Sequence, residues 1–555
     1  MRFPRLWCIW LLLFWLWPSV GFPSLDAIAS PTVSERVQEQ LRNRIGAAGS
    51  GRPIAIGDQR LPPTKTLVTF YTRRHYHPAW SDEGKLLPDI NDLVTAIRDA
   101  AKEGLISSEY HLPPLKDLLA SLQPQQQAET SLHVDRLTDL DILLTDAFLR
   151  YSSHLLIGRI SPTVENGAWG VQRETVDLAQ ILQTALETGD IADALAGLLP
   201  SHLAYSRLRQ ALAHYRELAA AGGWPLIPAG VKMKKGDHGP HVSQLRARLK
   251  VEEDLGPEDS ANNALFDETV EQAVSRFQYR HGLDVDGIVG PLTLAALNVP
   301  AEFRVRQIIL NMERWRWLPR DLGSGALVVN IAGFSLDVVD RDQVPLTMKI
   351  VVGKPYTRTP VFHTAVTSII LNPAWNIPFR IATKELLPLI RKNPQYLSKN
   401  HITVLRGWGR QTKVIDATGI AWSKLSSRDF PYRLRQEPGP WNALGRIKFL
   451  LPNPFTVYLH DTPAQALFTQ AIRAFSHGCI RLEKPLDLAA YALQGTPWTR
   501  EALLAAIAQG DERTIRLPKP LPTYVGYWTA WVEQEGTVHF GSDLYGRDQR
   551  LERKD

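Results

Sequence analysis

The residues best suited to chemistry in this chain are one cysteine and two histidines. Cys479 follows His477 by two residues and His460 by nineteen. A thiol attacks as its thiolate, so it needs a nearby base that takes its proton. Two histidines beside the thiol provide candidate bases. The spacing therefore predicts a nucleophilic cysteine centre.

Cysteine usage supports this interpretation. The chain has 2 cysteines, and the other one, Cys8, lies in an apolar N-terminal stretch. If that stretch is an export signal, Cys479 is the thiol that remains, and a single thiol in an exported chain is a candidate reactive group. The alternative is a small buried hydrophobic residue, since free cysteine is often buried. The flanking histidines and Gly478 favour the reactive thiol.

The first thirty residues have the features of an export signal. Arg2 and Arg5 precede an apolar run from residue 6 to 17, Pro18 interrupts it, and Ala27-Ile28-Ala29 provides a cleavage site. Twelve apolar residues are few for a membrane span. Residues 1–29 are therefore predicted to be a signal peptide that is cleaved or retained as an inner-membrane anchor. The predicted location is the periplasm or cell envelope.

Length and composition set the remaining limits. A chain of 555 residues, 44% hydrophobic and 22% charged, predicts two to four globular domains. The net charge of +6 is compatible with anionic polymers or membrane surfaces. No Lys/Arg block with interleaved aromatic residues is present, which argues against nucleic-acid binding.

Two helical regions precede the part of the chain that contains Cys479. Apolar spacing over 137–157 and 181–212 predicts a helical scaffold domain at 31–230, closed by a Gly-Gly-Trp-Pro cluster at 222–225. Residues 231–300 predict a compact bundle of three short helices. Asp267 caps the second helix, Gly282 ends it, and Pro291 begins the third.

From about residue 301 the sequence is rich in short Val, Ile and Leu runs. Such runs at 326–331, 335–339, 348–352, 367–371 and 456–459, separated by turn residues, predict a β-sandwich or barrel. The regular spacing of strand-forming runs is interrupted at 376–436. This interruption predicts a helical and polar insertion that serves as a lid. The predicted domain spans 322–500, and 501–555 is a predicted C-terminal extension packed on it. The fold class is multidomain α+β.

Within this frame each residue near the thiol receives a role. His460 is the preferred base, because it ends the strand predicted at 456–459, and the carbonyl of Asp461 would hold its far ring nitrogen. Backbone amides near Gly478 and Cys479 would face the developing oxyanion. His477 and Ser476 have supporting roles in the same loop. Arg481 binds a substrate carboxylate or braces the loop through an ion pair.

These residues resemble the L,D-transpeptidase family with a YkuD-type catalytic domain. The family signature is an upstream His followed by Ser/Thr-His-Gly-Cys-x-Arg, here His460 and the run 476–481. Further matches point to a large subgroup with an inserted lid and a helical N-terminal scaffold. They lie at 352–354, 359–360, 372–378, 438–445, 448–449, 460–463 and 314–319. The pattern of residues 239–293 resembles a peptidoglycan-binding module.

The resemblance implies an activity and its partners. Cys479 would attack the bond after the third residue of a peptidoglycan tetrapeptide stem and expel the terminal D-alanine. An amine of a neighbouring stem would then resolve the thioester into a cross-link between third residues. Trp375 and Asn442, in matched motifs, would bind substrate. The resemblance implies no metal or organic cofactor, and it implies that carbapenems acylate the cysteine.

Three alternatives stay open at this point. Water in place of the amine gives an L,D-carboxypeptidase that uses the same thiol. His460, His477 and Cys479 also have the ligand types of a zinc site with one open position. The third alternative is a non-catalytic peptidoglycan-binding scaffold with a relict site.

Overall fold

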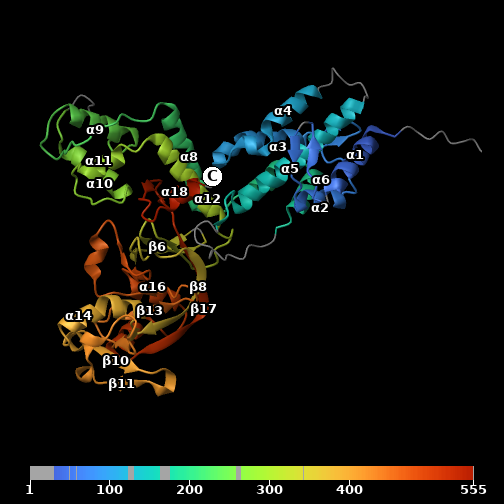
Figure 1. The fold of residues 1–555 in the computed structure, drawn as a ribbon. Helices are drawn as coiled ribbons and strands as arrows, with labels where there is room; N and C mark the ends of the chain where they lie inside the picture. The colour runs from blue at the N-terminus through green and yellow to red at the C-terminus, as the bar shows by residue number, and fades with distance from the viewer. Residues whose placement is uncertain are drawn as a thin grey trace, which may run out of the picture.

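Three lobes meet at a central junction (Figure 1). The computed structural model describes residues 31–48, 51–57, 59–122, 131–162, 176–257, 264–341 and 343–553. The predicted signal or anchor at 1–29 lies outside these residues. Within the described ranges, no helix is both long and apolar enough to cross a membrane.

The N-terminal lobe is helical, as predicted. Its long central helix α5 packs against α1, α2, α4 and α6, and their apolar faces form one core around Leu140, Leu144 and Phe148. The helices are α1 (Val33–Ala48), α2 (Lys65–Arg73), α3 (Asp89–Arg98), α4 (Leu112–Ser121), α5 (Ser131–Ile157), α6 (Leu178–Thr188) and α7 (Ile191–Ala196). Helix α8 (Leu203–Ala220) follows and packs in a separate core at the junction.

The second lobe is the predicted three-helix bundle. It consists of α9 (Pro240–Val251), α10 (Glu268–Arg280) and α11 (Pro291–Leu297) around a separate apolar core. The Asp267 side chain accepts a hydrogen bond from the amide of Val270 (3.1 Å), which satisfies a free N–H at the start of α10. Pro291 occupies the first turn of α11, where its missing N–H costs nothing. The capping predictions are confirmed.

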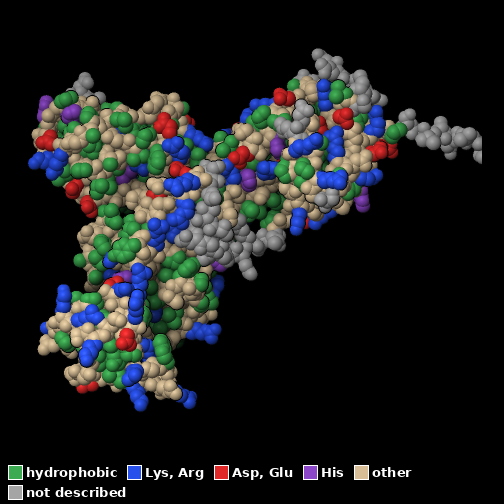
Figure 2. Space-filling view, in the orientation of Figure 1, with side chains coloured by type: hydrophobic (Ala, Val, Ile, Leu, Met, Phe, Trp, Pro, Cys, Tyr) green, Lys and Arg blue, Asp and Glu red, His purple; other side chains and the backbone are tan. Residues whose placement is uncertain are grey.

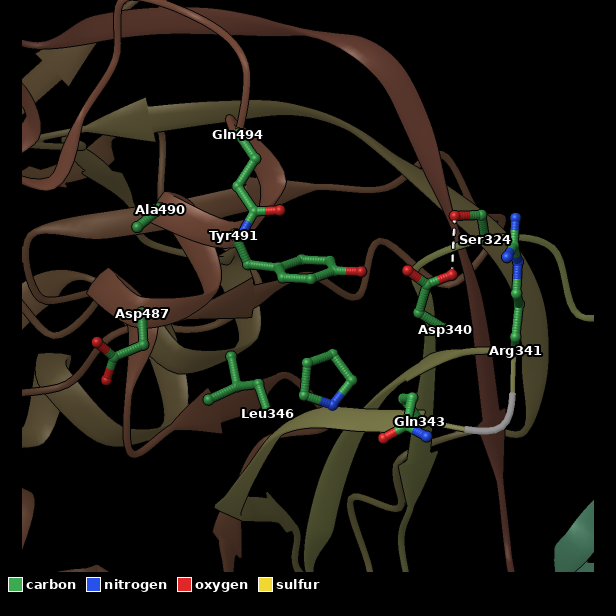
Figure 3. Close-up of a pocket in the computed structure, with 10 residues that line it drawn as sticks. Ser324, Asp340, Arg341, Gln343, Leu346, Asp487, Ala490, Tyr491 and Gln494 are labelled. Carbon is green, nitrogen blue, oxygen red and sulfur yellow. Dashed lines mark hydrogen bonds between the residues drawn. The ribbon is translucent and has the colours of Figure 1, made fainter.

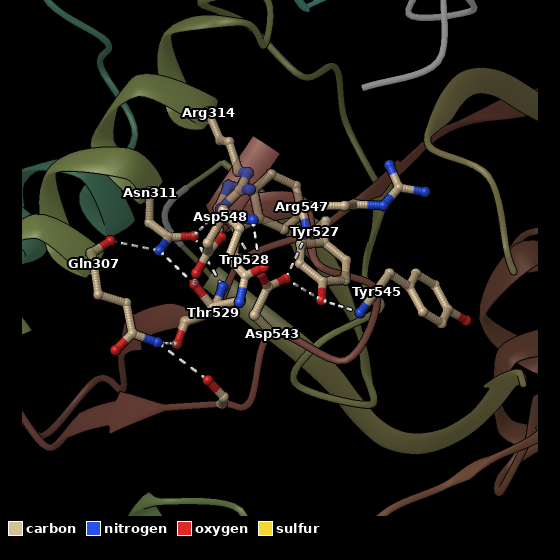
Figure 4. Close-up of polar contacts among 12 residues, drawn as sticks. Gln307, Asn311, Arg314, Tyr527, Trp528, Thr529, Asp543, Tyr545, Arg547 and Asp548 are labelled. Atoms are coloured by element: carbon tan, nitrogen blue, oxygen red, sulfur yellow. Dashed lines mark hydrogen bonds and ion pairs between the residues drawn. The ribbon is translucent and has the colours of Figure 1, made fainter. Parts of the chain in front are cut away.

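Helix α12 (Ala301–Arg316) joins the lobes, and its charged residues are buried. Arg316 donates to the hydroxyl of Tyr205 in α8 (2.8 Å) and pairs with Glu313 (3.0 Å). Arg314 pairs with Asp548 of the C-terminal helix α18 (Arg547–Glu552) at 2.6 Å (Figure 4). Because a buried ion is stable only when it is paired, these bonds fix the scaffold and the C-terminus to one helix.

The third lobe contains a nine-stranded sheet that closes on itself. The strand order is β15-β7-β16-β14-β13-β8-β17-β5-β6, and β6 also pairs with β7. Closure leaves no free edge along the ring and supports the predicted sandwich or barrel. The strands are β5 (Ala326–Asn330), β6 (Ser335–Asp340), β7 (Gln343–Gly353), β8 (Phe362–Leu371), β13 (Ile447–Leu450), β14 (Leu459–His460), β15 (Ala474–Ser476), β16 (Ile480–Leu482) and β17 (Arg513–Gly526).

The segment 501–555 is more than an extension packed on the domain, so that prediction is wrong. Its strand β17 lies inside the sheet, antiparallel to β8 and parallel to β5. A register shift between Arg516 and Leu521 bends the strand so that it follows both halves of the sheet. The sheet therefore needs residues to 526. Helices α16 (Pro485–Ala492) and α17 (Arg500–Gln509) pack on its core.

The insertion predicted at 376–436 is present and interrupts the main sheet, but it is not only helical and polar. Strands β9 (Trp375–Asn376), β10 (Ile402–Arg406), β11 (Lys413–Ile415) and β12 (Arg433–Gln436) form a separate sheet in the order β11-β10-β12-β9. This sheet shares an apolar core with α14 (Leu387–Lys392) and α15 (Tyr396–Lys399), which Pro394 separates. The insertion is thus a folded subdomain. Twelve Lys and Arg against three Asp and Glu give residues 376–436 a net charge of +9, and at that end of Figure 2 blue side chains are more widespread than red ones.

The strand expected at 456–459 is shorter than predicted. The side chain of Asn453 donates to the carbonyl of Val457 (2.7 Å) and accepts from the amides of Phe455 and Val457 (both 3.1 Å). These bonds hold a loop in which Thr456 has a φ of 55°. Strand β14 therefore consists of Leu459 and His460, and His460 is its last residue, which agrees with the predicted position at the end of this strand.

Candidate active site

Three adjacent strands bring the chemically active residues onto one face of the sheet. His460 of β14 pairs in register with Arg481 of β16 on one side and with Lys448 of β13 on the other. Cross-strand partners share a face, and side chains two residues apart in a strand do so too. Tyr458 and Cys479 therefore project on the same side as that row. The pairing of these three strands, and not proximity in the sequence, brings the five side chains together.

Cys479 lies beside Tyr458, which the sequence argument missed. Burial raises the pKa of the Cys479 thiol, and hydrogen bonds from the backbone and hydroxyl of Tyr458 oppose that rise. The indole of Trp375 in turn bonds the Tyr458 hydroxyl. Trp375 belongs to the inserted subdomain, so the predicted substrate residue contacts the nucleophile through the tyrosine. The thiol is protonated at neutral pH.

His460 is buried and neutral. Its Nδ1 contacts the carbonyl of Asp461 at 2.6 Å, the contact that the sequence predicted, and because a carbonyl only accepts, Nδ1 carries the proton. Burial, then the charges of Arg481 and Lys448, lower the pKa of His460 to about 3. No hydrogen bond joins its ring to Cys479 among the described residues. The imidazole can accept a proton only through a rearrangement or when those charges are neutralised.

Two cations flank the thiol and the imidazole. The ammonium of Lys448 lies 3.9 Å from the centre of the Tyr458 ring, and burial lowers the pKa of Lys448. Arg481 is partly buried, its Nε has no hydrogen-bond partner, and it forms no ion pair within the residues that the structure describes. The brace proposed for Arg481 from sequence is therefore not formed. An unpaired guanidinium next to the Cys479 thiol can bind a carboxylate.

The loop before the nucleophile is held by its own polar groups. The Oγ of Ser476 donates to the Cys479 carbonyl (2.5 Å) and accepts from the Gly478 amide (3.0 Å). Thr359 donates to the Gly478 carbonyl at 2.9 Å. Gly478 has a φ of +117°, a conformation that favours glycine. Because the Gly478 amide is already bonded, it does not face an oxyanion here, and that prediction needs correction; Ser476 keeps its supporting role.

His477 points away from the thiol. It is exposed, and its Nε2 lies 2.6 Å from a carboxylate oxygen of Glu385 in the inserted subdomain. This pair joins the nucleophile loop to the subdomain. The position agrees with a supporting role and not with that of the base.

Asn442 is not placed to bind substrate, contrary to the prediction. It is fully buried, donates to the carbonyls of Gln436 (3.2 Å) and Glu437 (3.0 Å), and accepts from the amide of Leu444 (2.8 Å). The hydrogen bonds of the Asn442 side chain all stabilise the loop at 436–445. Its role is to hold the loop that leads into β13.

The zinc alternative does not match the geometry. In the described part of the chain, no three His, Cys, Asp or Glu side chains gather closely enough to hold a metal ion. His477 turns toward Glu385, while His460 faces the Asp461 carbonyl. The three residues of that alternative are therefore not assembled as ligands.

A large cavity lies elsewhere. A space of about 1120 Å³ is bordered by Ser324, Asp340, Leu346, Asp487 and Tyr491, between the β6–β7 turn and α16 (Figure 3). Leu346 and Gly353 are seven residues apart on β7, about 23 Å at the rise of an extended strand. Gly353 is the residue that pairs with the nucleophile loop at Ser476. The cavity is thus separate from the cysteine site.

Comparison with known protein families finds matches for three segments of the chain. Residues 324–499 match the model of the L,D-transpeptidase catalytic domain, YkuD, and they contain the whole cluster described above. The chain carries a YkuD-type L,D-transpeptidase domain. Residues 238–297 match the "Putative peptidoglycan binding domain" model, and 65–212 match the model of the scaffold domain. The resemblance stated from the sequence is confirmed.

Individual relatives agree to different extents. A Haemophilus influenzae protein named "Putative L,D-transpeptidase" is 32% identical over 246 residues, which cover 44% of this chain and 49% of that protein. The chain thus spans about half the length of this relative. The L,D-transpeptidase structure from Xylanimonas cellulosilytica is 16% identical, with 54% of this chain and 99% of that chain covered and a TM-score of 0.16. The Ldtfm–avibactam carbamoyl enzyme is 12% identical, with 58% and 100% covered and a TM-score of 0.16.

A glycine beside Asp461 provides a stability test of the L,D-transpeptidase domain. Gly445 has a φ of +63°, and a Cβ there would overlap the Asp461 carboxyl group. That carboxylate accepts from the amides of Arg446 and Thr462, both at 2.7 Å, so it cannot move freely. Gly445→Ala should lower the free energy of unfolding by about 3 kcal/mol.

Gly409→Ala is the matched control. Gly409 has a similar φ of +56° but open space around its Cβ position, so only the backbone conformation is penalised, by about 1 kcal/mol. Thermal and urea denaturation of both variants measure the difference. Equal destabilisation would contradict the argument that Asp461 is held rigidly.

The Tyr458 hydroxyl should control thiol reactivity. Tyr458→Phe removes a hydrogen bond that stabilises the thiolate, so the pKa of Cys479 should rise and alkylation by iodoacetamide at pH 8 should slow by about tenfold, one pKa unit. The measurement is the alkylation rate against pH, in a Cys8→Ser background. Tyr396→Phe, in the inserted subdomain, is the control and should leave the rate unchanged. An unaltered rate in Tyr458→Phe would remove the tyrosine from the mechanism.

Proposed function

We propose that this protein is a peptidoglycan L,D-transpeptidase that uses Cys479 as its nucleophile. The observation that carries the proposal is the assembly of Cys479, Tyr458, His460, Arg481 and Lys448 on one sheet face of a YkuD-type domain. A thiol and an imidazole that can take its proton are the groups that acyl transfer to sulfur requires, and the two cations can bind a carboxylate of the substrate.

In the first half-reaction a C–S bond forms between Cys479 and the carbonyl of the third stem residue. The C–N bond to the terminal D-alanine breaks, and the thiol proton passes by way of His460 to the departing amine. In the second half-reaction the amine of a neighbouring stem attacks the thioester. A C–N bond forms, the C–S bond breaks, and a proton returns to sulfur.

The cations explain how a histidine with a low pKa acts as base. Burial, and then the charges of Arg481 and Lys448, disfavour the imidazolium of His460 in the free enzyme. A stem carboxylate bound to either cation cancels part of that charge and raises the pKa of His460. Proton transfer from the thiol is then less unfavourable when substrate is present than in the free enzyme. The resting thiol stays protonated and protected from side reactions.

The charge distribution supports an anionic polymer as partner. The inserted subdomain concentrates a net charge of +9 over residues 376–436, while the whole chain carries +6. Peptidoglycan stems carry carboxylates, and a basic surface beside the thiol raises their local concentration. We further propose that residues 1–29 direct the chain to the periplasm, as a cleaved signal or a retained anchor.

The decisive experiment is mass spectrometry after incubation of the full chain with a disaccharide-tetrapeptide. The expected products are a Cys479 thioester adduct, released D-alanine and dimers joined through third residues. Tripeptide without dimers would identify the enzyme as an L,D-carboxypeptidase. Absence of both the adduct and D-alanine release, with a folded protein, would indicate the non-catalytic scaffold. A carbapenem should form an adduct at the same cysteine.

A further inference from the structure

The turn between β10 and β11 of the inserted subdomain presents apolar side chains to solvent. Trp408, in the turn, is 75% exposed, and Val414 of β11 is 71% exposed. The two strands lie at the end of the third lobe that is remote from the junction (Figure 1). Lys and Arg side chains protrude at the same end (Figure 2). A flat surface could therefore reach this turn without meeting the other lobes.

The indole of Trp408 is held in a fixed position although it is exposed. The guanidinium of Arg433 lies 4.3 Å from the centre of the ring. Arg433 also donates to the carbonyl of Gly407 (3.1 Å) and to the hydroxyl of Thr412 (3.0 Å), which lie on either side of the turn. Because the ring is ordered before a partner arrives, binding through it costs little side-chain entropy.

The two exposed apolar side chains share one face of the hairpin. Leu405 of β10 pairs in register with Val414 on one side and with Arg433 of β12 on the other. Cross-strand partners share a face, so these three residues form one row, and Trp408 stacks on the arginine of that row. Leu405 is buried within the row, which leaves Val414 and Trp408 open to solvent.

Exposed cations surround the same turn. Arg406 and Lys413 pair across the hairpin, and Arg410 lies in the turn itself. Asp416 is the acidic residue nearest to the turn in sequence, and its carboxylate accepts from the amide of Thr418 at 2.9 Å. Residues 406–416 therefore carry three cations and one carboxylate, and the arginine under the indole adds a fourth cation.

The other acidic residues of the inserted subdomain leave this charge in place. Glu385 contacts His477 on the nucleophile loop, and Asp429 directly follows Arg428 in sequence. Residues 376–436 thus keep their net charge of +9. Positive charge around exposed apolar groups is complementary to a surface that has negative charge outside and an apolar layer beneath.

We propose that the β10–β11 turn docks on a membrane surface that contains anionic phospholipids. The hairpin meets the surface turn first, so that the indole of Trp408 enters the headgroup layer, where tryptophan is enriched in membrane proteins. Arg406, Arg410 and Lys413 contact lipid phosphates around it. Each cation strengthens binding to anionic lipid by about fivefold, so three give a preference of about a hundredfold over neutral lipid. A soluble anionic polymer would use the same charges but offers no apolar layer for Trp408 and Val414.

Docking at this turn leaves the thiol site open. In the sheet order β11-β10-β12-β9, the strands β11 and β9 are the two edges, about 14 Å apart by three strand spacings. Trp375 of β9 is the residue that bonds the Tyr458 hydroxyl beside Cys479. The membrane contact and the thiol site thus lie toward opposite edges of the inserted sheet. The proposal does not depend on the proposed function.

The test places an environment-sensitive nitrobenzoxadiazole label at the turn. The full chain carries Cys8→Ser and Cys479→Ala, and Gln411→Cys provides the labelling site. On vesicles of equal parts phosphatidylglycerol and phosphatidylcholine the emission should shift to the blue, and on phosphatidylcholine alone it should not. The matched labelling site is Ser398→Cys, an exposed position of α15, which precedes the other end of β10. A label there should not respond.

Matched variants separate the turn from the rest of the surface. Trp408→Ser and Val414→Glu should each weaken the lipid affinity reported by the label at 411 by at least about fivefold. Lys413→Gln should weaken it by about fivefold, whereas Lys399→Gln, which removes the same charge beyond the other end of β10, should have a smaller effect. Leu292→Ser removes an apolar side chain that is 68% exposed in the three-helix bundle and should bind like the parent. Circular dichroism checks that each variant is folded.

The label makes the outcomes distinguishable. Vesicle binding without a response at 411 would show attachment through residues 1–29 alone and would overturn the proposal. An equal response to neutral vesicles, or a parental response in Trp408→Ser, would overturn it as well. A response to soluble peptidoglycan fragments but not to vesicles would reassign the turn to an anionic polymer. Turnover of the unmodified chain is measured separately, so its absence would refute the proposed function and leave the docking result unaffected.

Discussion

Replacing Cys479 with alanine should lower the rate of stem-peptide cross-linking by about 10⁴-fold or more. The variant has no atom that can form the thioester, and removal of a nucleophile costs rates of this order in other acyl-transfer enzymes. Cys479 lies at the junction of the nucleophile loop and β16, where alanine fits without new contacts. The fold should therefore remain intact, and circular dichroism with thermal denaturation checks this. D-alanine release and dimer formation are the readouts.

Two controls separate this outcome from its alternatives. Cys8→Ala removes the other cysteine of the chain and should leave the rate unchanged. Exhaustive chelation should also leave the rate of the unmodified chain unchanged, whereas iodoacetamide should abolish it. Loss of activity on chelation alone would favour a metal-dependent reaction, and cross-linking by Cys479→Ala at the parent rate would exclude the cysteine mechanism altogether.

Replacing His460 should lower kcat/KM by at least tenfold more than replacing His477. His460→Gln removes the group that takes the thiol proton and should lower kcat/KM by 10² to 10⁴, the usual range for a general base. His477→Gln keeps a hydrogen-bonding side chain opposite Glu385 and should lower kcat/KM by less than about tenfold. The pair is matched, because both lie close to Cys479 in sequence and receive the same new side chain.

The pH profile adds an independent readout for His460. Its pKa of about 3 and the raised pKa of the Cys479 thiol leave both groups neutral between these limits. In the free enzyme kcat/KM should therefore be flat from about pH 5 to pH 8, without the acid limb near 6.5 of an ordinary histidine. A larger loss in His477→Gln than in His460→Gln, or a clear limb near 6.5, would move the role of base away from His460.

Local sequence was enough to predict the helical elements and to single out a candidate nucleophile. The three-helix bundle could be predicted because its caps are local: Asp267 and Pro291 each act within one helical turn. The contact between His460 and the Asp461 carbonyl could be predicted because it joins adjacent residues. The family signature around Cys479 is likewise a short run, and a residue pattern at fixed spacing is visible in one dimension.

The tertiary structure decided what depends on strand pairing. Lys448 and Tyr458 join the site because β13, β14 and β16 are neighbours, and no local pattern marks them. Asn442 matched a motif, yet burial showed that it serves the loop. Strand β17 completes the sheet from 513 to 526, since pairing between distant strands leaves no local signal. The sequence by itself singled out Cys479 as the candidate nucleophile, while the three-dimensional packing decided which charges surround it.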